Sequence, residues 1–162
     1  MRRATLRWLF SMPLLLLAGG CDSSGDEGET SESGGPVEAC TNETRAMEYS
    51  AGMQVASDGG KVMATLVEAT PAPPIRDLND WDLVFTAPDG SSLGEIDVSV
   101  EPWMPDHGHG SANPATSIVA GEGDGWKLSS LDLFMAGYWE VHFDFTLPGG
   151  EEDRVTFGFC VD

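Results

Sequence analysis

From residue 46 to residue 160 the chain consists of short apolar stretches separated by turns, and this rhythm limits the folds open to it. In the clearest stretch Ile96, Val98 and Val100 alternate with polar residues, as in a strand that is buried on one face only. No apolar repeat of helical period is sustained in this region, and Gly- and Pro-rich turns bound the stretches. The expected strands are residues 46–55, 61–69, 81–85, 96–100, 116–120, 126–133, 138–146 and 155–160. The pattern predicts an all-β fold, namely an antiparallel β-sandwich of seven to eight strands.

The first 20 residues have the layout of a secretory signal. Three arginines precede an apolar run over 8–18, which is shorter than the roughly 20 residues that a helix needs to cross a bilayer. The small residues directly before Cys21 resemble the bacterial lipobox. We therefore predict a lipoprotein signal peptide over 1–20 and a protein anchored to the membrane through lipid on Cys21, within the bacterial cell envelope and facing the periplasm. The alternative is an ordinary signal that is cut nearby and leaves Cys21 free.

The segment 21–38 separates the predicted anchor from the predicted domain, residues 39–162. Residues 22–36 have no aromatic or aliphatic side chain, so they cannot bury enough surface to offset the entropy of ordering. We expect a disordered acidic tether. Removal of the signal would leave 5 of the 8 Lys and Arg against 27 Asp and Glu, a net charge of −22. This charge argues against binding to nucleic acid and favours a soluble monomer.

Two cysteines, Cys40 and Cys160, lie near the two ends of the predicted domain. In an exported protein an even pair is most simply a disulfide. The alternative is a pair of thiolates that binds metal or exchanges electrons, and it fits poorly because the chain has no C-x-x-C sequence. A disulfide would place the first part of the domain beside the last strand.

The sequence WMPDHGHGS, residues 103–111, contains two of the three histidines of the chain. In extended backbone, side chains two residues apart point the same way, so His107 and His109 could face one point. Met104 would add a thioether, and imidazole with thioether suits copper better than zinc. The alternative is an ordinary exposed loop between strands whose histidines are solvated.

Two motifs resemble those of the YtkA-like domain family, which is related to FixH-type proteins. They are MPDHGHG at 104–110 and FMAGYW at 134–139, preceded by Asp80-Trp81, and the resemblance covers about residues 62–161. It implies an immunoglobulin- or cupredoxin-like sandwich in an envelope protein, with lipoproteins common in the family. Several members are linked to copper handling or oxidase assembly.

Carried onto this chain, the resemblance implies a copper site in which Met104, His107 and His109 are metal ligands and Met135 is the fourth. Met135 could instead be a core residue, because methionine often fills apolar gaps. Asp106 would accept a hydrogen bond from an imidazole N–H. Trp103 or Trp139 would wall the site.

The sequence has no recognisable catalytic motif, so we expect a protein that is not an enzyme. The third histidine, His142, alternates with apolar Val141 and Phe143 and is expected on a strand surface. An electron-carrying cupredoxin would need a cysteine ligand, and both domain cysteines are expected to be bridged. The favoured function is copper buffering, or delivery to or from another envelope protein. The alternative is a structural or protein-interaction β-sandwich that binds no metal.

Overall fold

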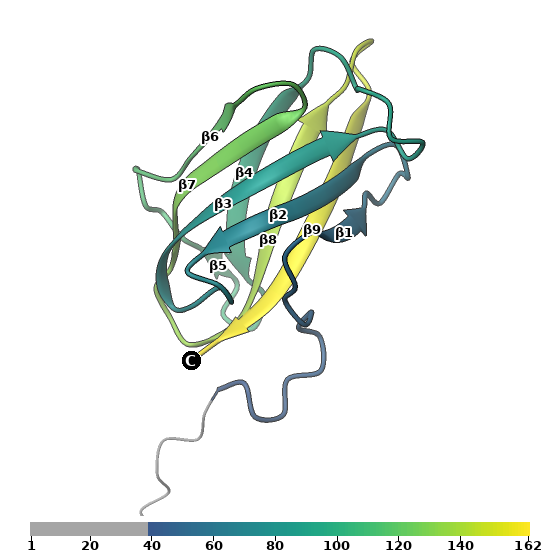
Figure 1. The fold of residues 1–162 in the computed structure, drawn as a ribbon. Helices are drawn as coiled ribbons and strands as arrows, with labels where there is room; N and C mark the ends of the chain where they lie inside the picture. Colours follow the sequence, from purple (N-terminus) through teal and green to yellow (C-terminus); the bar gives the residue numbers. More distant parts are fainter. Residues whose placement is uncertain (1–38) are drawn as a thin grey trace, which may run out of the picture. The chain divides into compact units, whose positions relative to one another are not determined.

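The computed structural model describes residues 39–162, which form nine β-strands (Figure 1). The strands are β1 (Met53–Ala56), β2 (Met63–Thr70), β3 (Asp77–Thr86), β4 (Asp97–Met104), β5 (His109–Gly110), β6 (Ser117–Ala120), β7 (Gly125–Leu133), β8 (Gly137–Thr146) and β9 (Glu152–Val161). No helix in this part of the chain is long and apolar enough to cross a membrane. The predicted signal peptide, the lipid-bearing Cys21 and the tether over 21–38 lie outside the described residues.

The strands form two antiparallel sheets that pack face to face (Figure 1). One sheet has the order β1-β2-β3-β7-β6 and the other the order β5-β4-β8-β9. With β2 taken as strand A, these are the A-B-E-D and C′-C-F-G orders of an immunoglobulin-like sandwich. The prediction of an all-β, immunoglobulin-like sandwich is therefore confirmed.

Alternation of side chains supplies the core between the two sheets. On β8 the side chains of Val141, Phe143 and Phe145 point inward and are at most 2% exposed, while the residues between them face outward. Trp81 of β3 fills the centre, with its ring centroid 5.5 Å from that of Phe159 and 6.4 Å from that of Phe143. Burial of such large aromatic groups is the main source of stability in a domain of this size.

Two short strands differ from the sequence prediction. The expected strand over 46–55 is reduced to β1. The residues before β1 make a single backbone hydrogen bond with β9, from the Met47 amide to the Gly158 carbonyl at 2.8 Å. The two-residue strand β5 was not predicted at all. It pairs with the end of β4 and turns the histidine loop into a β-hairpin.

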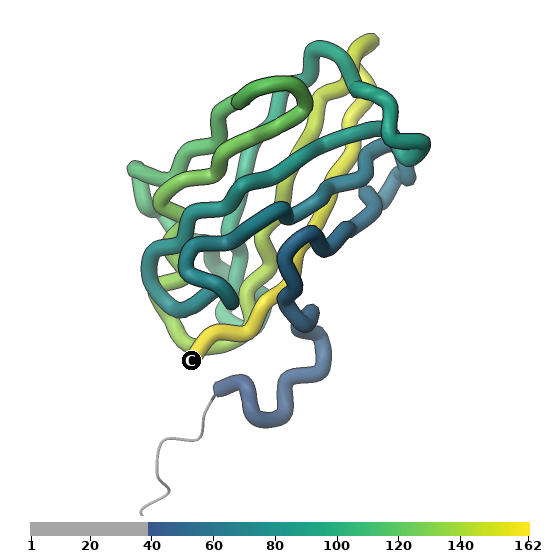
Figure 2. The backbone as a smooth tube through the Cα atoms, viewed as in Figure 1, coloured from purple at the N-terminus to yellow at the C-terminus, as the bar shows by residue number. Residues whose placement is uncertain are grey.

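The Cys40–Cys160 disulfide is present, as predicted. Cys160 lies on β9, the last strand, so the bridge fastens the start of the domain to its end. Figure 2 shows the segment before β1 running beside β9. The disulfide lies at the end of the sandwich to which the histidine hairpin also belongs.

Candidate metal centre

A tight turn presents the two histidines at one end of the sandwich. The Met104 carbonyl accepts hydrogen bonds from the amides of His107 (3.1 Å) and Gly108 (2.9 Å). Gly108 has φ of 68°, a conformation that glycine adopts without the steric cost of a Cβ. His107 therefore projects from the turn, whereas His109 already belongs to β5.

His109 faces the inside of the sandwich. It is paired directly with Met104 across the β4–β5 hairpin, and paired residues point to the same face of a sheet. Its half-buried ring stacks on Phe134, with centroids 5.9 Å apart, and meets Trp139 edge-on at 6.5 Å. The structure thus brings together the two motifs that the sequence separates by more than 20 residues.

The His107 and His109 rings lie close enough to share a metal ion. Their centroids are 5.6 Å apart and their planes are 81° apart. A metal lies about 2 Å from an imidazole nitrogen that binds it, so two rings on one metal have centroids on the order of 4.5 to 6.3 Å apart. The observed separation falls within this range.

A hydrogen bond also selects the nitrogen of His109 that is free to bind metal. Its Nδ1 lies 3.2 Å from the Gly110 carbonyl oxygen. Because a carbonyl can only accept, Nδ1 must carry the proton in this contact, which leaves the lone pair on Nε2. Holding one ring nitrogen in this way is how metal-binding histidines are commonly oriented.

Met104, the strand partner of His109, is buried, with 2% of its surface exposed. Its terminal methyl occupies the space over Gly137, where an added Cβ would lie 2.6 Å from it. Gly137 also has φ of 131°, which disfavours any other residue. The glycine of the second motif therefore makes room for the methionine of the first, and Met104 packs as a core residue next to His109.

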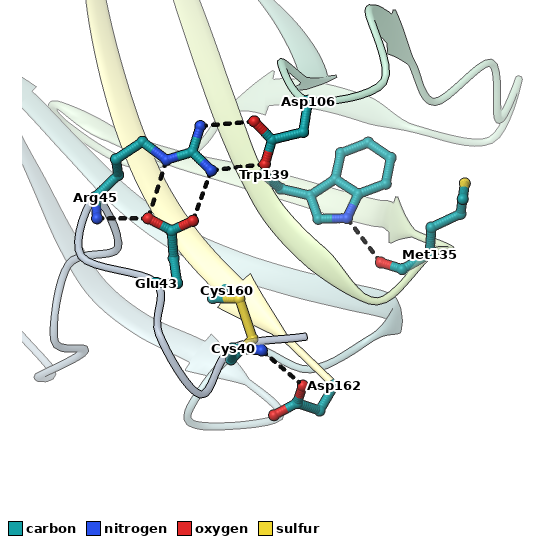
Figure 3. The surroundings of a disulfide bond; sticks show 8 residues. All are labelled: Cys40, Glu43, Arg45, Asp106, Met135, Trp139, Cys160 and Asp162. Carbon is teal, nitrogen blue, oxygen red and sulfur yellow. Dashed lines mark hydrogen bonds and ion pairs between the residues drawn. A yellow bond between two sulfur atoms is a disulfide. The ribbon is translucent and has the colours of Figure 1, made fainter. Parts of the chain in front are cut away.

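Met135 is half-buried and packs against the core. Its backbone carbonyl accepts a hydrogen bond from the indole Nε1 of Trp139 at 2.9 Å, as Figure 3 shows. This bond fixes the chain between β7 and β8 next to the His109–Phe134 stack. Of the two tryptophans expected to wall the site, Trp139 contacts His109, whereas Trp103 pairs with Glu140 on the outer face of its sheet.

The family resemblance implied that Asp106 orients an imidazole, but the structure gives its carboxylate another partner. Both of its carboxylate oxygens accept hydrogen bonds from Arg45, at 2.8 and 2.6 Å. The guanidinium holds the pKa of the Asp106 carboxyl below its ordinary value. Neither Arg45, which is 61 residues away from Asp106, nor Phe134 was predicted to contribute to this site.

Within residues 39–162 no three His, Cys, Asp or Glu side chains are grouped so that they could hold a metal ion. A metal held by the two imidazoles would need a further ligand of another kind, and the family resemblance implies methionine sulfur for this role. That donor set suits copper, and Cu(I) above all.

His142 lies on the outer face of the four-stranded sheet, as its alternation with Val141 and Phe143 predicted. Its Nε2 is 3.0 Å from a Glu140 carboxylate oxygen and its Nδ1 is 3.7 Å from one of Glu101. These neighbours leave 11% of the side chain exposed. His142 is thus on the opposite side of the sheet from His109.

Comparison with known proteins adds no relative. No family model, no curated protein and no solved structure matches the chain. The likeness to YtkA-like domains therefore depends on the two motifs alone and stays a prediction.

Replacing Gly110 with alanine is expected to push β5 away from β4 and to lower the free energy of unfolding by about 1–3 kcal/mol. The new Cβ would lie 2.6 Å from the Pro102 carbonyl oxygen, a backbone atom that cannot turn aside. The Ser111 amide donates to the same oxygen at 3.1 Å, so its protection from hydrogen exchange should fall, as measured by NMR.

Gly123→Ala is the control for this substitution, because Gly123 lies in a turn and has no atom within 4 Å of the added Cβ. Gly123 has φ of 61°, so alanine there strains the backbone, but this strain is confined to the turn around residue 123. Unchanged protection of the Ser111 amide in Gly110→Ala would contradict the hairpin.

Proposed function

We propose that the protein is a lipid-anchored, periplasm-facing protein of the bacterial envelope that binds copper through His107, His109 and Met104. Met135 is the proposed fourth ligand. The role is copper buffering, or exchange of copper with another envelope protein, without catalysis. The observation that carries the proposal is the approach of the two imidazole centroids to 5.6 Å beside the Met104 side chain.

The chemistry of the donors supports copper over other metals. Thioether sulfur is a soft ligand that favours Cu(I), and imidazole binds both Cu(I) and Cu(II). The Nδ1–H of His109 bonded to Gly110 leaves Nε2 as its donor atom. Bound copper would be the cargo, and the chain's part is to present nitrogen and sulfur at the end of a rigid sandwich.

The position of the site suits transfer between proteins. His107 is exposed on the turn, while His109 is half-buried between Phe134 and Trp139. A partner could reach the outer ligand first, whereas the inner ligands are shielded from water. The strongly acidic composition raises the local concentration of cations in a general way.

Titration of the mature protein in detergent with Cu(I) and Cu(II), separately, tests the proposal. We expect submicromolar binding of at least one oxidation state. Mutation of residues that only hydrogen-bond to metal ligands lowers metal affinity by about 10- to 100-fold. Removal of two ligands in His107→Ala/His109→Ala is therefore expected to weaken binding by more than about 100-fold. His142→Ala is the matched control, because it removes the histidine on the other face and should leave the affinity unchanged. Equal weak binding by all three proteins would refute the copper site.

A second function, a non-catalytic protein-interaction domain without metal, is favoured by one observation. Phe134 stacks on His109 and is nevertheless 43% exposed, so an apolar ring is available at the same end of the sandwich. Exposed aromatic rings are typical anchors of protein interfaces. Under this alternative the histidine hairpin shapes a docking edge and the titration shows no specific copper binding.

A further inference from the structure

The segment between Cys40 and β1 carries one arginine that joins it to the histidine hairpin. Figure 3 shows the Arg45 guanidinium between the carboxylates of Glu43 and Asp106. It donates to the two oxygens of Asp106 at 2.8 and 2.6 Å and to the two oxygens of Glu43 at 3.0 and 2.6 Å. All the donors in these four bonds belong to one planar group, so its orientation is fixed from two sides.

This cluster makes more contacts than an ordinary surface ion pair. Exposed pairs usually contribute little, because two long side chains must be held in one geometry. Here the Arg45 guanidinium also lies over the Tyr138 ring, 4.4 Å from its centroid. The Arg45 amide donates to Glu43 at 2.6 Å, which fixes the backbone of the arginine as well.

Both ends of the segment that carries Arg45 are fastened to β9. The Cys40–Cys160 disulfide holds one end, and the Cys40 amide donates to the Asp162 carboxylate at 3.1 Å (Figure 3). At the other end the Met47 amide donates to the Gly158 carbonyl. Arg45 is therefore presented from a closed loop and not from a free strand end.

Asp106 is the residue of the histidine hairpin that this segment contacts through Arg45. It directly precedes His107 in the turn whose amides bond to the Met104 carbonyl. We propose that Arg45 is a positioning residue: held by the disulfide-closed segment, it fixes Asp106 and thereby the direction in which His107 faces His109. The part of this inference that concerns metal affinity rests on the copper site proposed above, and the part that concerns loop order does not.

A double-mutant cycle without metal tests the loop. In Arg45→Gln and in Asp106→Asn, hydrogen exchange of the His107 and Gly108 amides is expected to be about tenfold faster. The double variant should be no faster than either single one, because both changes break the same contact. Arg45→Lys should recover only part of the protection, since an ammonium cannot bond two carboxylates through a planar fork. Lys127→Gln is the control, because it breaks an exposed ion pair with Asp82 on the other sheet.

Unchanged exchange in Arg45→Gln, or additive effects in the double variant, would overturn the inference. Cu(I) titration of the same proteins is the second measurement. The affinity for Cu(I) is expected to fall about tenfold in Arg45→Gln and in Asp106→Asn, and to stay constant in Lys127→Gln. Faster exchange with unchanged affinity would overturn the positioning role. If exchange is faster in the variants but neither they nor the wild type bind copper, the proposed function is refuted. The effect of Arg45 on the order of the turn is then still established.

Discussion

Replacing Cys40 and Cys160 together with alanine is expected to lower the free energy of unfolding by about 4–5 kcal/mol. The bridge joins residues that are 120 positions apart, so it closes almost the whole described domain into one loop. Without the bridge the unfolded chain gains the entropy of an open chain, and that gain grows with the logarithm of loop length. Urea denaturation of the mature protein under non-reducing conditions measures the difference.

Two comparisons make this prediction specific. Wild-type protein unfolded in the presence of dithiothreitol should have the same urea midpoint as the double alanine variant, because both lack the same bond. The slope of the transition should be larger for both than for the oxidised protein, since the unbridged chain exposes more surface. A double variant as stable as the oxidised wild type would show that the bridge does not constrain unfolding.

The fold could be predicted because each long strand shows its alternation of apolar and polar residues within a short stretch of sequence. Alternation on 96–100 is reproduced in β4. The most deeply buried residues of β8 follow the same period, namely Trp139, Val141, Phe143 and Phe145. Period-2 patterns of five residues or more are strong signals for half-buried strands. The strand β5 has two residues, too few to show any period, and it exists only because the turn before it returns the chain to β4.

The candidate metal centre could be predicted only in part, for a related reason. The His107 and His109 rings do lie near each other, but the extended backbone that the spacing prediction assumed is absent. His107 lies in the turn, only His109 lies on a strand, and the rings are nearly perpendicular. The partners of these residues come from distant segments: Phe134 stacks on His109, and Arg45 binds Asp106. Which of several cationic side chains pairs with a given carboxylate depends on the finished fold. No local sequence pattern could therefore predict these partners.

Asp153→Ala is expected to destabilise the domain by about 3 kcal/mol or more, because it removes a buried acceptor shared by several donors. The Asp153 carboxylate, 9% exposed, accepts from the Ser57 hydroxyl at 2.6 Å and from the amides of Gly59 (2.7 Å) and Lys61 (3.1 Å). These donors belong to the turn between β1 and β2, so the change should also loosen that turn. Asp89→Ala is the control, because the Asp89 carboxylate also accepts two hydrogen bonds within a turn but is exposed.

The effect of Asp153 should also depend on pH. Burial alone would raise the pKa of this carboxyl, but the hydrogen bonds from Ser57, Gly59 and their neighbours outweigh it and the pKa is lowered. A lowered folded-state pKa stabilises the fold fully above the unfolded value of about 3.9, and this contribution is lost as the pH falls through the folded value. The stability difference between wild type and Asp153→Asn, measured by urea denaturation, should therefore be constant from neutral pH to about pH 5 and shrink below about pH 4. A difference that persists unchanged in acid would mean that the Asp153 carboxylate charge does not hold the β1–β2 turn.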